Sequence, residues 1–234
     1  MAVMLPDNLI WILDKLGLEW PDINEDEVFK AADLTRTFRD DLEALIQLAD
    51  SRIVTDVAAG MRSRGGEAYI AAWNTNRSQH LQKLLDALDP IALGIDGAGA
   101  VVIALKVKFA VQLTLTLATL VPLLALGPFG AAAAAARMIA TKVATGILVD
   151  LAVSELIDAV DGPVLEVLND VVPGVMQMIL DAPIVEDTGA DVGEILFDLE
   201  VLEQAEADMN QHAGDAETLV QQFMADIAGL HITE

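Results

Sequence analysis

The chain has 234 residues, of which 54% are hydrophobic and 4% aromatic, with a formal net charge of −24 and no cysteine. So large a negative charge repels the phosphate backbone of nucleic acids, which argues against nucleic acid as a partner. The absence of cysteine excludes a disulfide framework and thiolate chemistry. The apolar residues are mostly Ala, Leu, Val and Ile, which favours close-packed helices and predicts an all-α fold, an elongated helical bundle.

The first residues, MAVMLPDNLIWILDK, lack the basic region and cleavage site of a signal peptide. Any export is therefore expected to proceed without a cleaved signal peptide. Leu9, Ile12, Leu13 and Leu16 recur at helical spacing and predict a short amphipathic helix, with Gly17 at its C-cap. The acidic loop that follows, EWPDINEDE, suits the start of another helix because negative charge stabilises helix N-termini.

Two long amphipathic helices are predicted next, over residues 25–59 and 67–88, joined by the stretch MRSRGG. A short glycine-bearing connection between two such helices is typical of an antiparallel hairpin. The apolar residues of both helices recur at steps of three and four, as in a coiled-coil seam. This helix-packing seam includes Phe38, Leu42, Leu45, Ala49, Leu84 and Leu88.

Pro90 and the glycines at 94, 97 and 99 predict a boundary after the hairpin. No charged residue lies between Lys108 and Arg137, and about 20 apolar residues are enough to span a membrane. Helices over 101–126 and 130–160 are thus either a membrane hairpin or the buried centre of a bundle. The charges that flank the run and the lack of a Trp or Tyr belt favour the bundle.

The last part of the chain is strongly acidic, because all 13 Lys and Arg lie at or before Lys142 and 20 acidic residues follow it. Pro163, Pro173 and Pro183 predict short segments there, and an apolar stripe over 199–223 is expected to pack back on the bundle. The predicted organisation has three parts: a hairpin with a short N-terminal helix (1–92), an apolar Ala-rich helical pair (93–162) and an acidic segment with a C-terminal amphipathic helix (163–234).

No residue pattern indicates an active site. His80, His212 and His231 are not at ligand spacing, and the acidic turn at 186–194 lacks the alternating oxygen ligands of a calcium loop. The glycines of 94–100 follow a helix rather than the strand that a dinucleotide site requires. We therefore expect no enzyme activity, no catalytic residue, no metal and no cofactor.

The hairpin resembles the WXG family of small helical-hairpin proteins that type VII secretion systems export. Glu67-Ala68-Tyr69 is similar to the Glu-Ala-aromatic stretch that opens the second helix in that family, and Trp73 corresponds to a later aromatic residue on the same face. The family's Trp falls on Met61 and its Gly on Ser63, so both signature residues are replaced.

These two replacements have a physical explanation. A methionine such as Met61 fills irregular apolar gaps between helices. Gly65 and Gly66 are expected to supply the backbone freedom that is lost at Ser63.

A second similarity lies upstream, in Gly17, Trp20, Pro21 and the acids that follow them. It resembles the entry of a larger subgroup, the WXG-like N-terminal domains of polymorphic toxins, in which the hairpin continues into an Ala-rich apolar helical pair. The resemblance covers about residues 1–150 and extends only loosely to the acidic remainder.

The resemblance implies a non-enzymatic helical domain of a type VII secretion substrate, located outside the cell or in its envelope. It also implies pairing with itself or with another helical protein, and contact with the secretion apparatus. The family's Tyr-x-x-x-Asp/Glu export signal is absent, because Trp73 stands four residues after Tyr69. Two alternatives stay open: a pore-forming membrane protein that uses residues 101–160, and a structural protein that assembles with itself.

Overall fold

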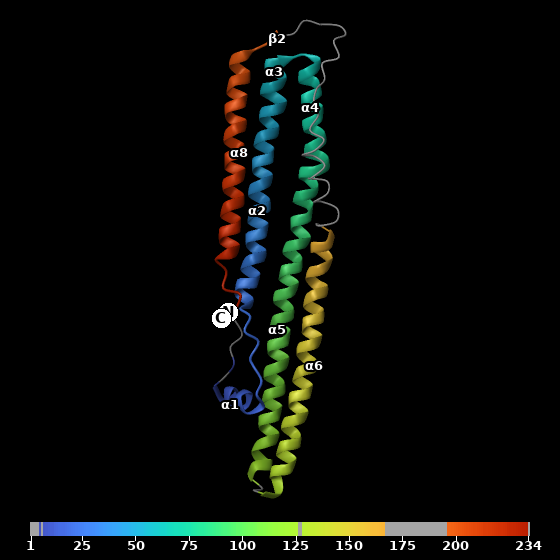
Figure 1. Cartoon of the computed structure of the whole chain (residues 1–234), viewed down its shortest axis with the longest axis vertical. Helices are drawn as coiled ribbons and strands as arrows, with labels where there is room; N and C mark the ends of the chain where they lie inside the picture. Colours follow the sequence, from blue (N-terminus) through green and yellow to red (C-terminus); the bar gives the residue numbers. More distant parts are fainter. Residues whose placement is uncertain (1–4, 6, 126–127, 167–195, 234) are drawn as a thin grey trace. The chain divides into compact units, whose positions relative to one another are not determined.

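The computed structural model describes residues 5, 7–125, 128–166 and 196–233. These residues form an all-α helical bundle, which confirms the predicted fold class, with one two-residue antiparallel ladder between β1 and β2. The elements, shown in Figure 1, are α1 (Asp7–Leu16), α2 (Glu25–Arg52), η1 (Ile53–Val57), α3 (Ala58–Gly60), β1 (Met61–Arg62), α4 (Arg64–Asn76), η2 (Arg77–Leu81), α5 (Gln82–Ala125), α6 (Pro128–Glu166), β2 (Leu196–Phe197) and α8 (Leu199–Ala228).

The chain divides into two compact units, each built from segments that are distant in sequence. Unit 1 comprises Met1–Ala32, Leu93–Gly162 and Leu230–Glu234, and unit 2 comprises Asp33–Ala92 and Pro163–Gly229. Helices α2 and α5 each contribute residues to both.

The core of unit 1 forms where α1 packs on α5. Leu9, Leu13 and Leu16 of α1 are buried against Phe109 and Leu113 of α5. The chain leaves α1 through Gly17, whose φ of 60° and hydrogen bond from its N–H to Asp14 O end the helix. This left-handed conformation costs little only for glycine, so the predicted C-cap is confirmed.

Helix α2 begins as its sequence predicts. The Asn24 side chain caps it by accepting hydrogen bonds from the N–H groups of Asp26 (3.1 Å) and Glu27 (3.4 Å). The first turn is acidic, which complements the positive end of the helix dipole. The C-terminal tail of unit 1 also meets this start, because Asn24 N donates to Ile232 O at 2.7 Å.

Helices α5 and α6 lie side by side in unit 1 (Figure 1), and polar side chains fix their register. The buried hydroxyls of Thr116 and Thr141 are 2.8 Å apart, and Arg137 Nε donates to Thr119 Oγ1 at 3.1 Å. A buried polar group is costly unless it has a partner, so the buried Thr116–Thr141 pair favours one alignment of the two helices. The Arg137–Thr119 hydrogen bond is exposed.

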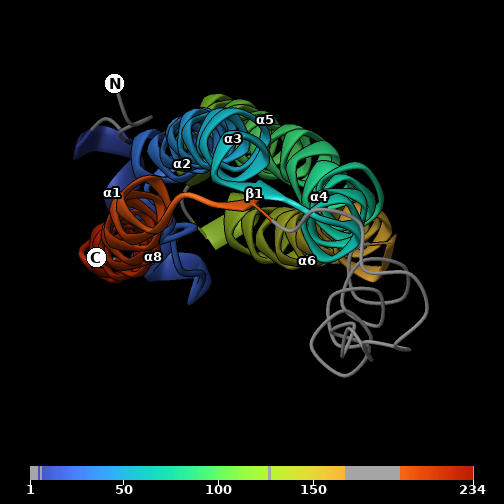
Figure 2. The same cartoon turned by 90° about the horizontal axis from the view of Figure 1, so that it is seen from above.

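Unit 2 is a group of helices in which α4 runs back along α2 and α8 packs on α2 (Figures 1 and 2). Arg77 of η2 pairs with Asp50 of α2 at 2.6 Å. Phe38 of α2 stacks on Phe223 of α8 with ring centroids 4.5 Å apart, and Arg52 pairs with Asp208 of α8 at 3.3 Å.

Pro90 and the three glycines do not end a helix, because α5 continues through them from Gln82 to Ala125. The chain nevertheless passes from one compact unit to the other between Ala92 and Leu93. Gly99 serves packing instead: a Cβ there would lie 2.8 Å from the ring of Phe29. Pro90 deprives the helix of one N–H, but buried neighbours such as Leu88 and Ala92 hold the segment in place.

Other predicted boundaries also moved. The second hairpin helix starts at Arg64 rather than at residue 67, and α6 continues past Pro163 to Glu166. Pro173, Pro183 and the acidic turn at 186–194 lie outside the described residues. In α8 the predicted stripe is only partly covered, since Ala205 is buried whereas Leu199 and Val220 are exposed.

Candidate functional site

The connection between α3 and α4 is the turn on which the predicted motif lies. Met61 and Arg62 form β1 and pair with Phe197 and Leu196 of β2. Ser63 then caps α4, with its Oγ accepting a hydrogen bond from Gly66 N at 3.1 Å. Serine at this position stabilises a helix by satisfying a free N–H of the first turn, which is a use of residue 63 that glycine does not offer.

Gly65 and Gly66 lie in the first turn of α4, and neither has a positive φ. Our explanation that they supply backbone freedom is therefore wrong. The reason for glycine at 66 is space: a Cβ there would lie 2.2 Å from Met61 O. At Gly65 the nearest atom to such a Cβ is Ser63 Oγ at 3.5 Å, an ordinary contact.

The aromatic pair of the motif splits between two roles. Trp73 is half-buried and donates its Nε1–H to Asp50 Oδ1 at 2.9 Å, so it ties α4 to α2 together with Arg77. Tyr69 is 47% exposed, and Glu67 beside it is exposed too. Of the two aromatic residues, Tyr69 is therefore the one open to a binding partner.

The helix-packing seam is occupied in part by the chain itself. Phe38 contacts Phe223 of α8, and Ala49 and Leu88 are buried. The other predicted seam residues, Leu42, Leu45 and Leu84, are half-buried. Their role in pairing with another protein stays a prediction.

The N-terminal motif residues lie in unit 1, away from the turn in sequence. Trp20 packs edge-on against Phe109 with centroids 5.8 Å apart, Gly17 ends α1, and Pro21 is half-buried in the loop before α2. Lys106 Nζ donates to Glu25 Oε2 and Ile23 O, both at 2.7 Å. This part of the motif thus stabilises the fold around a buried ion pair.

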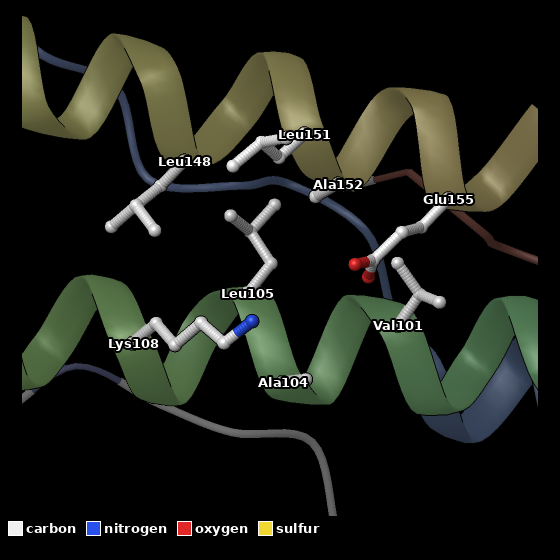
Figure 3. A pocket seen from close by; sticks show the side chains of 8 residues that line it. All are labelled: Val101, Ala104, Leu105, Lys108, Leu148, Leu151, Ala152 and Glu155. Atoms are coloured by element: carbon white, nitrogen blue, oxygen red, sulfur yellow. The ribbon is translucent and has the colours of Figure 1, made fainter.

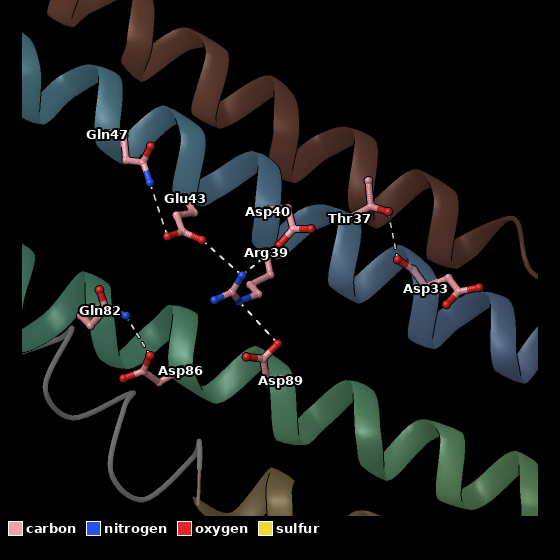
Figure 4. A network of polar contacts seen from close by, with 9 residues as sticks. All are labelled: Asp33, Thr37, Arg39, Asp40, Glu43, Gln47, Gln82, Asp86 and Asp89. Atoms are coloured by element: carbon pink, nitrogen blue, oxygen red, sulfur yellow. Dashed lines mark hydrogen bonds and ion pairs between the residues drawn. The ribbon is translucent and has the colours of Figure 1, made fainter.

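A cluster of three acidic residues in unit 2 surrounds Arg39. Arg39 contacts Asp40 and Glu43 on its own helix and Asp89 on α5, as Figure 4 shows. The pKa of Arg39 is raised, chiefly because Asp40 accepts its hydrogen bond. The positive charge of Arg39 offsets the negative charge of these carboxylates. Ion pairs at such exposed positions contribute little to the stability of the fold.

A similar arrangement surrounds Arg52. The hydrogen bond to Asp56 is the main cause that raises the pKa of Arg52, and Asp208 adds to it. The arrangement ties α2 to η1 and α8.

A small hollow between α5 and α6 is the other candidate site. Its volume is about 40 Å³, far below the several hundred Å³ of typical ligand pockets. Figure 3 shows apolar side chains of both helices in the space between them, together with the charged ends of Lys108 and Glu155. The lining residues are Val101, Ala104, Leu105, Lys108, Leu148, Leu151, Ala152 and Glu155.

Metal ligation finds no support in the part of the chain that the structure describes. No group of three or more His, Cys, Asp or Glu is placed to hold an ion there. His212 is half-buried on α8 and His231 is exposed.

Apolar side chains are unusually exposed on α5 and α6. Val111 and Leu115 of α5 are 53% and 52% exposed, and Ile139 of α6 is 66% exposed. Among the described residues one helical stretch, Arg64–Leu123, is long and apolar enough to cross a membrane by length and composition, with 33% of its most apolar window buried. Since the core helix of a water-soluble protein passes the same test, this criterion leaves the membrane hypothesis open.

The fold and the turn together define an all-α protein built on a helical hairpin that carries an aromatic motif. A family model described as "WXG100 like domain" matches residues 4–147, more than half of the chain. The chain therefore belongs to the WXG100-like family and is a helical protein related to type VII secretion. No curated protein and no solved structure matches it.

Members of this family share several general properties. WXG100-like proteins are generally non-enzymatic, form helical dimers with a partner or with themselves, and leave the cell through type VII systems without a cleaved signal peptide.

Proposed function

We propose that this chain is a type VII secretion substrate whose helical bundle serves export and assembly, either as part of a toxin-like effector or as a free-standing partner protein. The observation that carries the proposal is the family match over residues 4–147, which includes the hairpin, its turn and most of the apolar pair.

We propose that the secretion apparatus recognises the turn between α3 and α4. Tyr69 is exposed on α4 directly after the capped and strand-paired segment 61–66. A large aromatic side chain held at a rigid turn is a suitable anchor, because aromatic residues contribute much of the binding energy at protein interfaces. In this proposal the half-buried seam residues Leu42, Leu45 and Leu84 supply a second, helical contact.

The test is export from cells that carry the matching secretion system. With the secretion ATPase disabled, the full chain is expected to stay inside the cell, as measured by immunoblotting of culture filtrate and lysate. A protein secreted by an unrelated route serves as the control. Export at an unchanged level without the ATPase contradicts the proposal.

Tyr69→Ala is expected to lower the exported fraction several-fold while the helical content and thermal stability stay unchanged, because the side chain is exposed. The matched control is Leu48→Ala, which removes an apolar side chain of similar exposure (53%) from α2 of the same unit. An equal loss of export in both variants would show that the effect is not specific to the turn.

A second candidate function is membrane insertion by α5 and α6, and the exposed apolar residues on both helices favour it. Leu117 is an unsuitable test position, because it packs against the core of unit 1. Leu115 lies two residues away and is 52% exposed.

If α5 inserts into lipid, Leu115→Asp abolishes leakage of dye from liposomes and leaves the fold in water intact. Leu93→Asp, at a 66% exposed position outside the uncharged run, is the control and retains leakage. A wild-type chain that causes no leakage at any lipid composition contradicts this second candidate.

A further inference from the structure

The outward face of α6 has the pattern of a coiled-coil seam but lies open. Thr141 and Thr145 are buried, and Thr141 contacts Thr116 of α5, which defines the inward side. Residues two positions along a helix are rotated by about 200°, so Ile139, Val143 and Ile147 lie on the other side. They are 66%, 59% and 55% exposed.

The spacing along this face is regular. A series with steps of four, three, four, three and four residues is the spacing of a heptad seam. We name it the α6 face; its members are Ile139, Val143, Gly146, Asp150, Val153 and Ile157. Val153 and Ile157 are 49% and 50% exposed, so the apolar members at both ends are open.

Residues of the α6 face, together with Lys142 and Val149 that flank it, are arranged symmetrically about Gly146. Ile139 and Val153 each lie seven residues from it, and the valines at 143 and 149 each lie three residues from it. Lys142 and Asp150 each lie four residues from it, with opposite charges. A face of this kind is self-complementary under a two-fold axis, where each copy presents the same patch to the other.

We propose that a second copy of this chain covers the α6 face, with the two α6 helices antiparallel and Gly146 on the two-fold axis. Antiparallel pairing sets Lys142 of each copy level with Asp150 of the other, whereas parallel pairing sets like charges together. Gly146 is exposed with nothing within 4 Å of a Cβ placed there, so the two backbones approach closely at the crossing point.

The charges also select protein rather than lipid as the occupant. Both Lys142 and Asp150 are exposed. Charged side chains are costly in the hydrocarbon of a bilayer, but they neutralise each other across the two-fold interface. Lys142 stands at the edge of the α6 face, since its Nζ is 3.9 Å from a Cβ built at Gly17 of unit 1. This inference goes beyond the proposed function, because it concerns a surface outside the hairpin and does not depend on export.

Cross-linking tests the arrangement, because the chain has no cysteine of its own. In the purified full chain, Gly146→Cys is expected to form a disulfide between copies under mild oxidation. Ile139→Cys alone is expected to form none, because its two copies lie about 21 Å apart along the helices, beyond the reach of a disulfide. The double variant Ile139→Cys/Val153→Cys is expected to cross-link again.

Charge reversal tests the pairing in solution by sedimentation equilibrium. Lys142→Glu is expected to weaken self-association by about tenfold, since two ion pairs of the dimer become repulsive, and Lys142→Glu/Asp150→Lys is expected to restore it. The control is Lys108→Glu, an exposed residue of α5 outside the α6 face.

Three results would overturn the proposal: a monomer at all concentrations, association that requires detergent or lipid, or cross-linking of Ile139→Cys on its own. These measurements use purified protein, so their failure leaves the export proposal standing.

Discussion

Replacement of Lys106 by methionine is expected to destabilise the protein by about 3–5 kcal/mol, the largest effect of any substitution considered. The Lys106 side chain is 4% exposed. Its ammonium lies 2.7 Å from both Glu25 Oε2 and Ile23 O, and 5.9 Å from the centre of the Trp20 ring. Without it, the Glu25 carboxylate, which is 1% exposed, loses its cation in the interior. Urea denaturation followed by circular dichroism measures the loss.

Two further variants separate the ion pair from simple loss of a side chain. Lys108→Met, two residues along α5 at an exposed position, is expected to leave the free energy of unfolding almost unchanged. Glu25→Gln/Lys106→Met removes both charges and is expected to recover much of the stability. If Lys106→Met and Lys108→Met have equal effects, the buried ion pair does not stabilise unit 1 in the way described.

Gly66→Ala is expected to destabilise unit 2 by about 3 kcal/mol, the upper end of the usual cost of overpacking. The methyl group would lie 2.2 Å from the carbonyl oxygen of Met61, so backbone rather than a flexible side chain has to move. The movement would also disturb β1 and the cap at Ser63. Thermal unfolding measures the change.

Gly65→Ala is the matched control, one residue earlier in the same helical turn. Its methyl group meets only Ser63 Oγ at 3.5 Å. Stability is expected to stay the same or to rise by up to about 1 kcal/mol, because alanine has less freedom in the unfolded chain. An equal loss of stability in both variants would mean that the contact with Met61 is not what requires glycine at position 66.

Sequence periodicity predicted the elements whose signals are local. The cap at Gly17, the acidic start of α2 and the hairpin all follow from neighbouring residues, and the structure contains them. The length of α5 did not follow, because proline and glycine signals describe the isolated chain, whereas Phe29 uses the space above Gly99. Tertiary packing overrides such local preferences.

The candidate site was predictable in composition but not in detail. The motif residues from Met61 to Trp73 were found from their order in the chain. Their partners, Asp50 and β2, lie far away in sequence, and no local pattern indicates either contact. The helix-packing seam was also predictable only in part. Its periodicity is visible in the sequence of α2, but the contact of Phe38 with Phe223 depends on where α8 packs.

The discontinuity of unit 2 sets the order of events during synthesis. Residues 33–92 leave the ribosome early, but β2 and α8, which pair with Met61 and stack on Phe38, are encoded more than 100 residues later. At ordinary translation rates that interval lasts roughly 5–20 s. During it, the α2 surface and the β1 edge are uncovered in a nascent chain, where a chaperone or a cognate helix has its earliest opportunity to bind. Completion of unit 2 therefore waits until α8 has been synthesised.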